Sequence, residues 1–307
     1  MTLKVGLVGI GAIARNQHIP VMRGRDDIEL VAAASRSASV DGLPCYPDIE
    51  AMLEAEPSIG AVSLCAPPAP RYAMAKAAIA RGRHVMLEKP PGATLSEVAE
   101  LEALAREAGV TLHATWHSRH APAVEPMRER LAGAEIVRVE CVWRESVRRW
   151  HPGQDWIWQP GGFGVLDPGI NALSILTHVL PRPFRCRDAT LHVPENAQTP
   201  IAVDATFADA DAAPLSMTLD WREEGDQTWD IRVETNGGKL HLRDGGAKLL
   251  ADGETIVDEP EREYAGVYDR FLALVAKGES DVDVAPLRHV ADIMMLGGRE
   301  TVERFDW

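Results

Sequence analysis

Apolar and polar positions along the first part of the chain separate short strands from amphipathic helices. The apolar runs with strand composition are Leu3–Val8, Leu30–Ala34, Ala61–Leu64, His84–Leu87 and Thr111–Ala114. The intervening stretches with apolar residues at helical spacing are Ala14–Met22, Asp48–Ala55, Arg71–Arg81 and Ser96–Ala108. This order predicts an α/β domain over residues 1–118, built on a doubly wound parallel sheet with helices on both faces.

The pattern changes in the second part of the chain, residues 119–307. Ile136–Trp143 alternates as a strand does, and short alternating runs continue from Phe184 to Val257, with hairpin turns at Asn236-Gly237 and Asp244-Gly245. Helical spacing marks Gly169–Leu180, Glu263–Ala276 and Pro286–Val302. We therefore predict a second α/β domain with a large, open, mostly antiparallel sheet, and expect its terminal helix to pack back on the first domain.

Composition narrows the class of protein. A chain of 307 residues with 46% hydrophobic and 25% charged residues can bury two cores. The net charge of −14 disfavours a nucleic-acid partner. The four cysteines have no C-x-x-C spacing, and no apolar run is long enough to cross a bilayer. We expect a cytoplasmic protein with no metal site and no membrane partner.

A glycine-rich turn follows the first predicted strand, in the sequence Gly9-Ile10-Gly11-Ala12-Ile13-Ala14. Gly9 permits a tight turn, Gly11 lets the backbone N–H groups approach a pyrophosphate, and Ala14 allows the helix to pack closely on the strand. Ala12 and Ile13 begin that helix. Between a strand and a helix, this turn predicts a dinucleotide site.

The end of the second strand indicates which dinucleotide is bound. It reads Ala34-Ser35-Arg36, where an NAD-specific site usually has an acidic residue for the ribose 2′-hydroxyl. Ser35 and Arg36 would instead bind a 2′-phosphate. We predict NADP as the preferred cofactor, with NAD as a second cofactor left open. The alternative is that Arg36 is simply a solvated loop residue.

Three further strand ends carry candidate site residues. They are Ala66-Pro67-Pro68, Glu88-Lys89 and Trp116-His117. In a doubly wound sheet, ligands bind at the carboxyl ends of the strands. We therefore predict that these residues project into the same crevice as the cofactor.

With these residues located, the chain resembles the glucose–fructose oxidoreductase / inositol dehydrogenase family over nearly its full length. The resemblance rests on the glycine turn, Pro67-Pro68, Glu88-Lys89-Pro90 and the run Gly161–Asp167. It implies an N-terminal Rossmann domain, a C-terminal α/β domain with an open sheet, and a homodimer.

Within that family the chain is most similar to bacterial L-arabinose 1-dehydrogenases and D-galactose 1-dehydrogenases. The matching stretches are Ala114–Arg119, Arg148–Gln154 and Asp167–Asn171. This resemblance implies oxidation of the C1 hydroxyl of L-arabinose or D-galactose to the aldonolactone, with hydride transfer to the nicotinamide. The two sugars share their ring configuration and differ at C5, so the sequence does not decide between them.

The base that removes the hydroxyl proton has two candidates. The broad family usually has a histidine four residues after the aspartate of its Asp-x-x-x-His motif, where this chain has Asn171, which cannot accept a proton near neutral pH. Asp167 then becomes the first candidate base, one helical turn before Asn171, with Lys89 stabilising negative charge on the oxygen. The alternative is Lys89 as the base, or Asp167 as a simple helix N-cap.

Sugar recognition is expected from the segment between Trp143 and Trp158, which holds four of the eight tryptophans. The predicted sugar-binding residues are His117, Glu145, Trp150, His151, Asp167, Asn171 and Trp229. Indole faces can pack on a pyranose, while the polar side chains bond its hydroxyls; ordinary core packing is the alternative for the tryptophans. An inositol- or polyol-oxidising enzyme is disfavoured by Asn171, and a non-catalytic NADP sensor by the presence of both Lys89 and Asp167.

Overall fold

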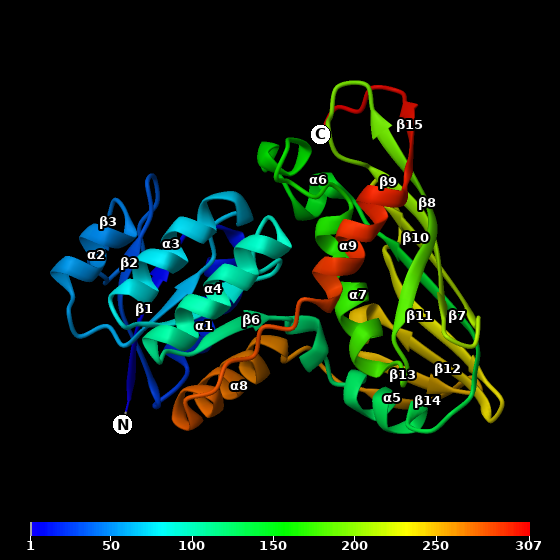
Figure 1. The fold of residues 1–307 in the computed structure, drawn as a ribbon, viewed down its shortest axis with the longest axis horizontal. Coiled ribbons are helices and arrows are strands. Elements are labelled where there is room, and N and C mark those ends of the chain that lie inside the picture. Colours follow the sequence, from blue (N-terminus) through cyan, green and yellow to red (C-terminus); the bar gives the residue numbers. More distant parts are fainter. Residues whose placement is uncertain (1) are drawn as a thin grey trace. The chain divides into compact units, whose positions relative to one another are not determined.

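The computed structural model describes residues 2–307, which divide into two compact units (Figure 1). The first unit contains the residues up to Trp116 together with Tyr264–Val284. The second contains His117–Glu263 and Ala285–Trp307. None of the helices in residues 2–307 combines the length and the apolar character that a membrane span requires.

Unit 1 is built on a six-stranded parallel sheet in the order β3-β2-β1-β4-β5-β6. Its strands are β1 (Leu3–Val8), β2 (Ile28–Ala34), β3 (Cys45–Tyr46), β4 (Ala61–Leu64), β5 (His84–Glu88) and β6 (Leu112–Thr115). The predicted doubly wound parallel sheet is confirmed. The two-residue strand β3 was not predicted, because so short a run has no periodicity.

Helices cover both faces of this sheet. They are α1 (Ile19–Arg23), α2 (Ile49–Ala55), α3 (Pro68–Ala80), α4 (Leu95–Ala108) and α8 (Glu263–Lys277). One core cluster holds Met52, Ile79 and Leu101 from α2, α3 and α4, whereas the other holds Met22 from α1 and Phe271 from α8. Helix α4 begins with the reciprocal Thr94–Glu97 capping box that its sequence indicates.

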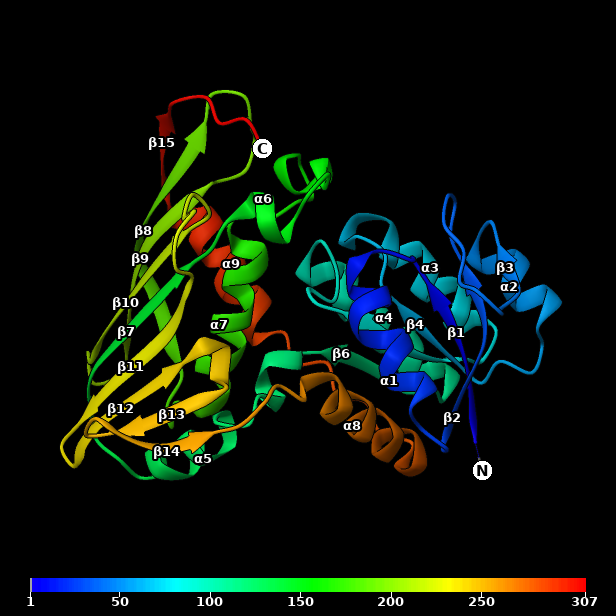
Figure 2. The same cartoon turned by 180° about the vertical axis from the view of Figure 1, so that it is seen from behind.

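Unit 2 contains a nine-stranded sheet in the order β14-β13-β12-β11-β7-β10-β9-β8-β15 (Figure 2). Its strands are β7 (Ile136–Arg144), β8 (Phe184–Pro194), β9 (Ala202–Asp209), β10 (Pro214–Asp220), β11 (Thr228–Thr235), β12 (Gly238–Arg243), β13 (Lys248–Ala251), β14 (Glu254–Asp258) and β15 (Gly298–Val302). Only the β7–β10 and β8–β15 pairs are parallel, so the predicted mostly antiparallel sheet is confirmed.

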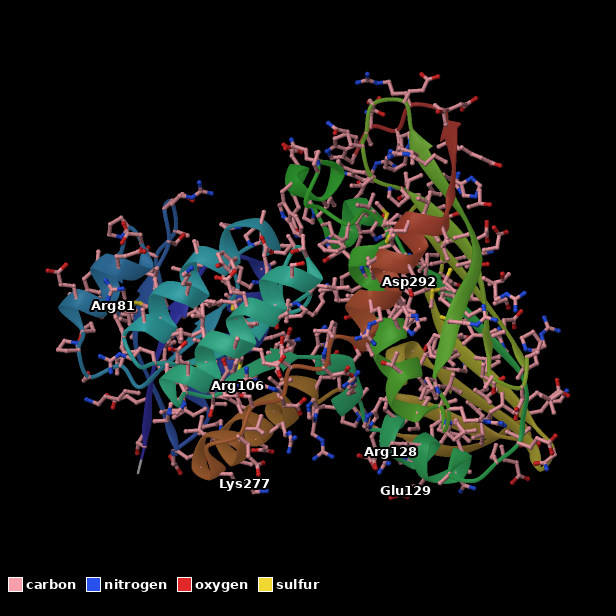
Figure 3. The ribbon with its side chains drawn as sticks, viewed as in Figure 1. Arg81, Arg106, Arg128, Glu129, Lys277 and Asp292 are labelled. Atoms are coloured by element: carbon pink, nitrogen blue, oxygen red, sulfur yellow. The ribbon has the colours of Figure 1, made fainter. Side chains whose placement is uncertain are left out.

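One face of this sheet carries helices α5 (Val124–Leu131), α7 (Leu166–Val179) and α9 (Ala285–Leu296). Helix α5 turns Met127 inward and points Arg128 and Glu129 to solvent (Figure 3). Helix α7 approaches β10 closely at Gly169, where a Cβ would lie 2.4 Å from Leu219 Cδ1. That close approach fixes the position of the first turn of α7.

One expectation about the last part of the chain is wrong. The predicted helix Pro286–Val302 ends at Leu296, because Gly297 and Gly298 follow, and Gly298–Val302 forms the edge strand β15. That the terminal helix packs back on the first unit stays a prediction for α9. Helix α9 belongs to unit 2, where His289 stacks on Phe184 at 4.3 Å between ring centroids. The segment that joins unit 1 is α8.

Candidate active site

The glycine turn of unit 1 has the geometry that a dinucleotide requires. Gly9 adopts a φ of +90°, and a Cβ there would lie 2.6 Å from the backbone nitrogen of Ala66. A Cβ on Gly11, in contrast, would meet no atom within 4 Å, so the turn borders open space. The chain is helical from Ala12, with a five-residue π-helical stretch from the buried Ala14 onward. These residues fit a pyrophosphate held at the start of a helix.

Two arginines lie at the loop after β2, Arg36 within the loop and Arg15 through a hydrogen bond to it. Arg36 is exposed, and the backbone N–H of the half-buried Ser35 donates to Tyr46 O at 2.9 Å. Arg15, which directly follows the glycine turn, donates from Nη2 to Ser39 O at 3.1 Å. Arg15 was not predicted as a site residue, although its position in the first helical turn was the available signal. Two guanidinium groups therefore belong to the region predicted to bind the ribose.

A buried carboxylate network lies behind Lys89. Glu88 is 4% exposed, and its Oε1 accepts hydrogen bonds from Thr115 Oγ1 (2.9 Å) and Tyr264 OH (2.8 Å), with His18 Nε2 at 3.1 Å. Its Oε2 accepts the backbone N–H of Lys89 at 3.0 Å. The side chain of Glu88 thus fixes the backbone of Lys89 at the end of β5. His18 and Tyr264 were not predicted as members of this region.

A second buried group holds neighbouring strand ends together. Arg71 of α3 is 2% exposed and donates from Nε to Ala66 O at 3.1 Å. Its Nη1 also donates to the carbonyl oxygens of Glu88 and Pro90. Pro67 and Pro68 start α3, Pro67 as the N-cap residue. The Arg71 guanidinium therefore connects the ends of β4 and β5, and Arg71 was not predicted as a site residue.

His117 opens a short 3-10 helix, His117–His120, at the beginning of unit 2. Its Nδ1 lies within hydrogen-bond distance of the Glu263 carboxylate. Burial, together with the negative charge of Glu263, raises the pKa of nearby Glu261. A carboxylate at Nδ1 sets the orientation and the tautomer of the His117 ring.

Four of the predicted sugar-binding residues form one cluster in unit 2, centred on Glu145. Glu145 is 5% exposed; its Oε2 accepts the indole N–H of Trp229 at 2.8 Å, and His151 Nε2 lies 3.7 Å from its Oε1. The rings of Trp150 and Trp229 meet edge to face with centroids 5.6 Å apart. Trp150 is 42% exposed, and the Arg149 guanidinium lies 4.9 Å from its ring centroid.

One member of this cluster, Trp221, was not predicted. It is fully buried, donates from Nε1 to Glu145 Oε1 at 3.2 Å, and has its ring centroid 5.1 Å from that of His151. Parallel pairing of β7 with β10 brings the two strand ends together, and Glu145 N donates to Asp220 O at 3.0 Å. Because strand pairing between distant segments sets this contact, no local signal could reveal it.

Asp167 and Asn171 lie one turn apart in the first half of α7. Asp167 is 5% exposed and occupies the second position of the helix, after the N-cap residue Val165. The alternative role of Asp167 as the N-cap is therefore wrong. Its backbone N–H donates to Gly164 O at 2.9 Å, and the Asn171 carbonyl accepts Ser174 Oγ at 2.7 Å.

Each unit thus assembles a different part of the predicted site. Unit 1 holds the glycine turn, Ser35, Arg36 and Lys89, and unit 2 holds the Glu145 cluster together with Asp167 and Asn171. Convergence of Lys89 and Asp167 on one reacting carbon stays a prediction. Within residues 2–307 no group of three or more His, Cys, Asp or Glu side chains is arranged to hold a metal ion.

A doubly wound parallel sheet that carries this glycine turn and a lysine at a strand end defines a nicotinamide-dependent oxidoreductase. Residues 3–115 match the model of an oxidoreductase family with an NAD-binding Rossmann fold. The chain is 41% identical to galactose 1-dehydrogenase of Pseudomonas fluorescens over 99% of its length and 98% of that protein. The chain belongs to this oxidoreductase family, which confirms the resemblance found in the sequence.

Two further relatives extend the comparison. The crystal structure of a D-galactose-1-dehydrogenase protein from Rhizobium etli matches with a TM-score of 0.95 and 55% identity, over 99% of this chain and 98% of that one. D-xylose 1-dehydrogenase (NADP(+)) 2 of Haloferax volcanii is 28% identical over 90% of both chains. The Rhizobium etli structure shares the fold described above over nearly the whole chain.

Proposed function

We propose that this protein is an NADP-preferring aldose 1-dehydrogenase that oxidises the C1 hydroxyl of D-galactose, L-arabinose or both to the aldonolactone. The observation that carries the proposal is the cluster around Glu145, where a buried carboxylate meets two indole N–H groups and the His151 ring. Such a cluster offers aromatic surface and oriented polar groups, the two features a pyranose can bind. The names of the relatives with 41% and 55% identity support galactose.

The chemistry requires loss of a proton from the C1 hydroxyl and of a hydride from C1. The nicotinamide, when bound, supplies the hydride acceptor. We assign the proton to a carboxylate oxygen of Asp167, and the stabilisation of charge on the sugar oxygen to the Lys89 ammonium. Asn171 orients the sugar because its amide can donate and accept hydrogen bonds.

The product formed from the sugar follows from the bonds that change. C1 loses its hydrogen as hydride and its hydroxyl loses a proton, so the bond from C1 to its hydroxyl oxygen becomes a carbonyl, while C1 stays bonded to the ring oxygen. The product is a cyclic ester, the aldonolactone. Neither step requires a metal or water, and the carboxylate of Asp167 returns to its starting form when the proton leaves to solvent.

NADP preference rests on the groups after β2. Ser35 and the exposed Arg36 stand where an NAD-specific site has a carboxylate, and Arg15 adds a second cation. A 2′-phosphate would gain charge-assisted hydrogen bonds from both guanidinium groups. NAD lacks that phosphate, so it is expected to bind more weakly.

The choice of sugar follows from what the two candidates share. D-galactose and L-arabinose have the same configuration around the pyranose ring, so His117, Glu145, His151 and Asn171 can bond both. The sugars differ by the hydroxymethyl group at C5, and a single small group typically changes selectivity by ~10- to 200-fold at most. We therefore expect turnover of both.

The decisive assay follows nicotinamide reduction in the near-ultraviolet with NADP and a panel of aldoses and inositols. Turnover of D-galactose or L-arabinose, with little or none for inositols, supports the proposal. Turnover of inositols alone would replace it with a polyol dehydrogenase. NADP binding without turnover of any panel member would indicate a non-catalytic sensor.

The base is tested by Asp167→Asn, which keeps the shape of the side chain and removes its basicity. We expect turnover to fall by ~10²- to 10⁴-fold while NADP affinity is unchanged. Asp226→Asn, at an exposed aspartate of the same unit, is the matched control. If Asp167→Asn retains turnover within tenfold of the wild type, the base is Lys89 and the assignment is wrong.

The cofactor assignment is tested by Ser35→Asp and Arg36→Ala. Ser35→Asp should invert the ratio of NADP to NAD efficiency, because a carboxylate repels the 2′-phosphate and bonds the 2′-hydroxyl. Arg36→Ala should weaken the binding of NADP and leave the binding of NAD unchanged. Arg81→Ala, at an exposed arginine of unit 1, is the control (Figure 3). An unchanged ratio in Ser35→Asp contradicts the preference.

A further inference from the structure

Residues 305–307 are packed against the segment that carries the proposed sugar-binding residues, although about 150 residues separate the two in sequence. After the edge strand β15, the chain runs to the vicinity of α6 (Val147–Trp150), as both ribbon views show (Figures 1 and 2). All of these residues belong to unit 2. We infer that Phe305, Asp306 and Trp307 form a positioning element that holds the sugar-recognition segment in its binding geometry.

The segment from Ser146 to Gly164 has little regular structure of its own. It contains the four-residue helix α6 and one turn of 3-10 helix, Asp155–Trp158. Short pieces of this kind are marginal without tertiary contacts, because few backbone hydrogen bonds offset the entropy of ordering them. The position of His151 and of the flanking Trp150 therefore depends on side-chain anchors.

Trp307 provides one pair of anchors. Its ring stacks on that of Trp158 with centroids 4.7 Å apart and an interplanar angle of 27°, and its Nε1 donates to Asp155 Oδ1 at 3.0 Å. Trp158 is 2% exposed, whereas Trp307 is 39% exposed. Trp307 therefore covers the outer face of a buried ring and holds both ends of the 3-10 turn.

Arg148 of α6 is held by Phe305 and Asp306, the two residues that precede Trp307. Arg148 Nη2 and Nε donate to Asp306 O at 2.5 and 3.1 Å, and the guanidinium carbon lies 4.5 Å from the Phe305 ring centroid. Phe305 is itself fixed, because its carbonyl accepts Asn196 Nδ2 at 2.8 Å and its N–H donates to Asn196 Oδ1 at 3.1 Å. The element thus links α6 to the loop after β8.

A continuous chain of ring contacts joins Trp307 to the proposed site. The ring centroid of Trp158 lies 5.3 Å from that of Trp221, in an edge-to-face contact. Trp221 then donates to Glu145 and lies against His151, as described above. Displacing Trp158 would therefore move a ring that orients two proposed sugar-binding side chains. Trp307 acts on the sugar only through these neighbours, so it is a positioning residue.

The inference rests on the proposed function and is tested with Trp307→Ala in the full chain. An aromatic pair of this kind corresponds to a ~2- to 10-fold effect on an equilibrium constant. We expect the KM for the aldose to rise by about that factor, with kcat within twofold and NADP affinity unchanged. Trp307→Phe keeps the stack and loses the bond to Asp155, so it should restore most of the affinity.

The matched control is Met295→Ala, which truncates a large side chain of unit 2 that is 83% exposed. This control should leave KM unchanged. If the KM for the aldose in Trp307→Ala equals that of the wild type, or if NADP affinity falls by the same factor, the positioning role is wrong. A purely structural role would lower the amount of active enzyme and leave KM alone.

A second readout needs no turnover, so it separates this inference from the proposed function. Fluorine spectra of protein labelled with 5-fluorotryptophan should show the resonances of Trp221 and Trp229 shifting in Trp307→Ala but not in Met295→Ala. Trp229 lies beyond Glu145, so its shift reports transmission to the proposed site. If only the Trp158 resonance moves, the inference is overturned, whatever sugar the enzyme oxidises.

Discussion

Substituting Glu88 by glutamine tests how the fold of unit 1 supports Lys89. The Glu88 carboxylate takes hydrogen bonds from Thr115, Tyr264 and the backbone N–H of Lys89, with His18 at hydrogen-bond distance, at 4% exposure. A glutamine has one acceptor oxygen in place of two. If that oxygen serves the three side chains, the amide NH₂ faces the N–H of Lys89, and two donors oppose each other.

The magnitude follows from the bonds that are lost. A hydrogen bond to a charged group contributes ~1.5–3 kcal/mol, and a buried donor left without an acceptor costs ~1–3 kcal/mol. Because one bond is broken and the others lose charge assistance, we expect Glu88→Gln to lower the free energy of unfolding by about 2–4 kcal/mol. Glu88→Ala, which removes every acceptor, should be more damaging.

The assay is urea unfolding of the full chain at neutral pH, followed by circular dichroism, together with aldose turnover. Glu54→Gln, at an exposed glutamate of α2, is the matched control and should stay within ~0.5 kcal/mol of the wild type. Turnover should fall in Glu88→Gln because the backbone of Lys89 loses its anchor. A Glu88→Gln protein as stable as the control variant would show that this network does not hold the end of β5.

Three further predictions concern other parts of the fold. Gly9→Ala places a Cβ against the backbone at a φ of +90°, so we expect loss of NADP binding in fluorescence titrations and lower stability. Gly169→Ala puts a Cβ 2.4 Å from Leu219 Cδ1 and should cost about 1–3 kcal/mol in urea unfolding; an unchanged midpoint would show that α7 can move. Burial lowers the pKa of His84, whose Nδ1 accepts the Thr111 N–H at 3.0 Å. Neutral His84 therefore stabilises the fold fully above the ordinary histidine pKa of about 6.5. This contribution to the free energy of unfolding is lost as pH falls through the lowered pKa. The urea unfolding midpoints at pH 7.5 and pH 5 should therefore differ less in His84→Asn than in the wild type. An equal difference in the two proteins would refute this role of His84.

Local patterns predicted most of the fold because the elements have clear periodicity. The strands β1 and β4 begin and end where their apolar runs do, and the Thr94–Glu97 pair marks the start of α4. The prediction failed where a local pattern was ambiguous. Pro286–Val302 reads as one helix until the cost of two adjacent glycines, Gly297 and Gly298, is counted.

The candidate site divides in the same way. Residues tied to a motif or a strand end, such as Gly9, Lys89 and Glu145, could be identified from the sequence. The partners of Glu88 and Glu145 could not, because Tyr264 and Trp221 come from positions 176 and 76 residues away along the chain. Pairing between distant segments is decided by the packing of the whole unit, and a single sequence carries little information about it.

Helix α8 has a consequence for how the protein is made. Val267, Tyr268 and Phe271 complete one of the two apolar layers on the parallel sheet, and they are translated after the whole mixed sheet up to β14. A nascent chain ending at Trp116 would expose that layer to water and lack the Tyr264 hydroxyl. The nucleotide-binding half therefore cannot mature on the ribosome ahead of the other half, and cutting the gene at residue 116 should give an aggregating fragment.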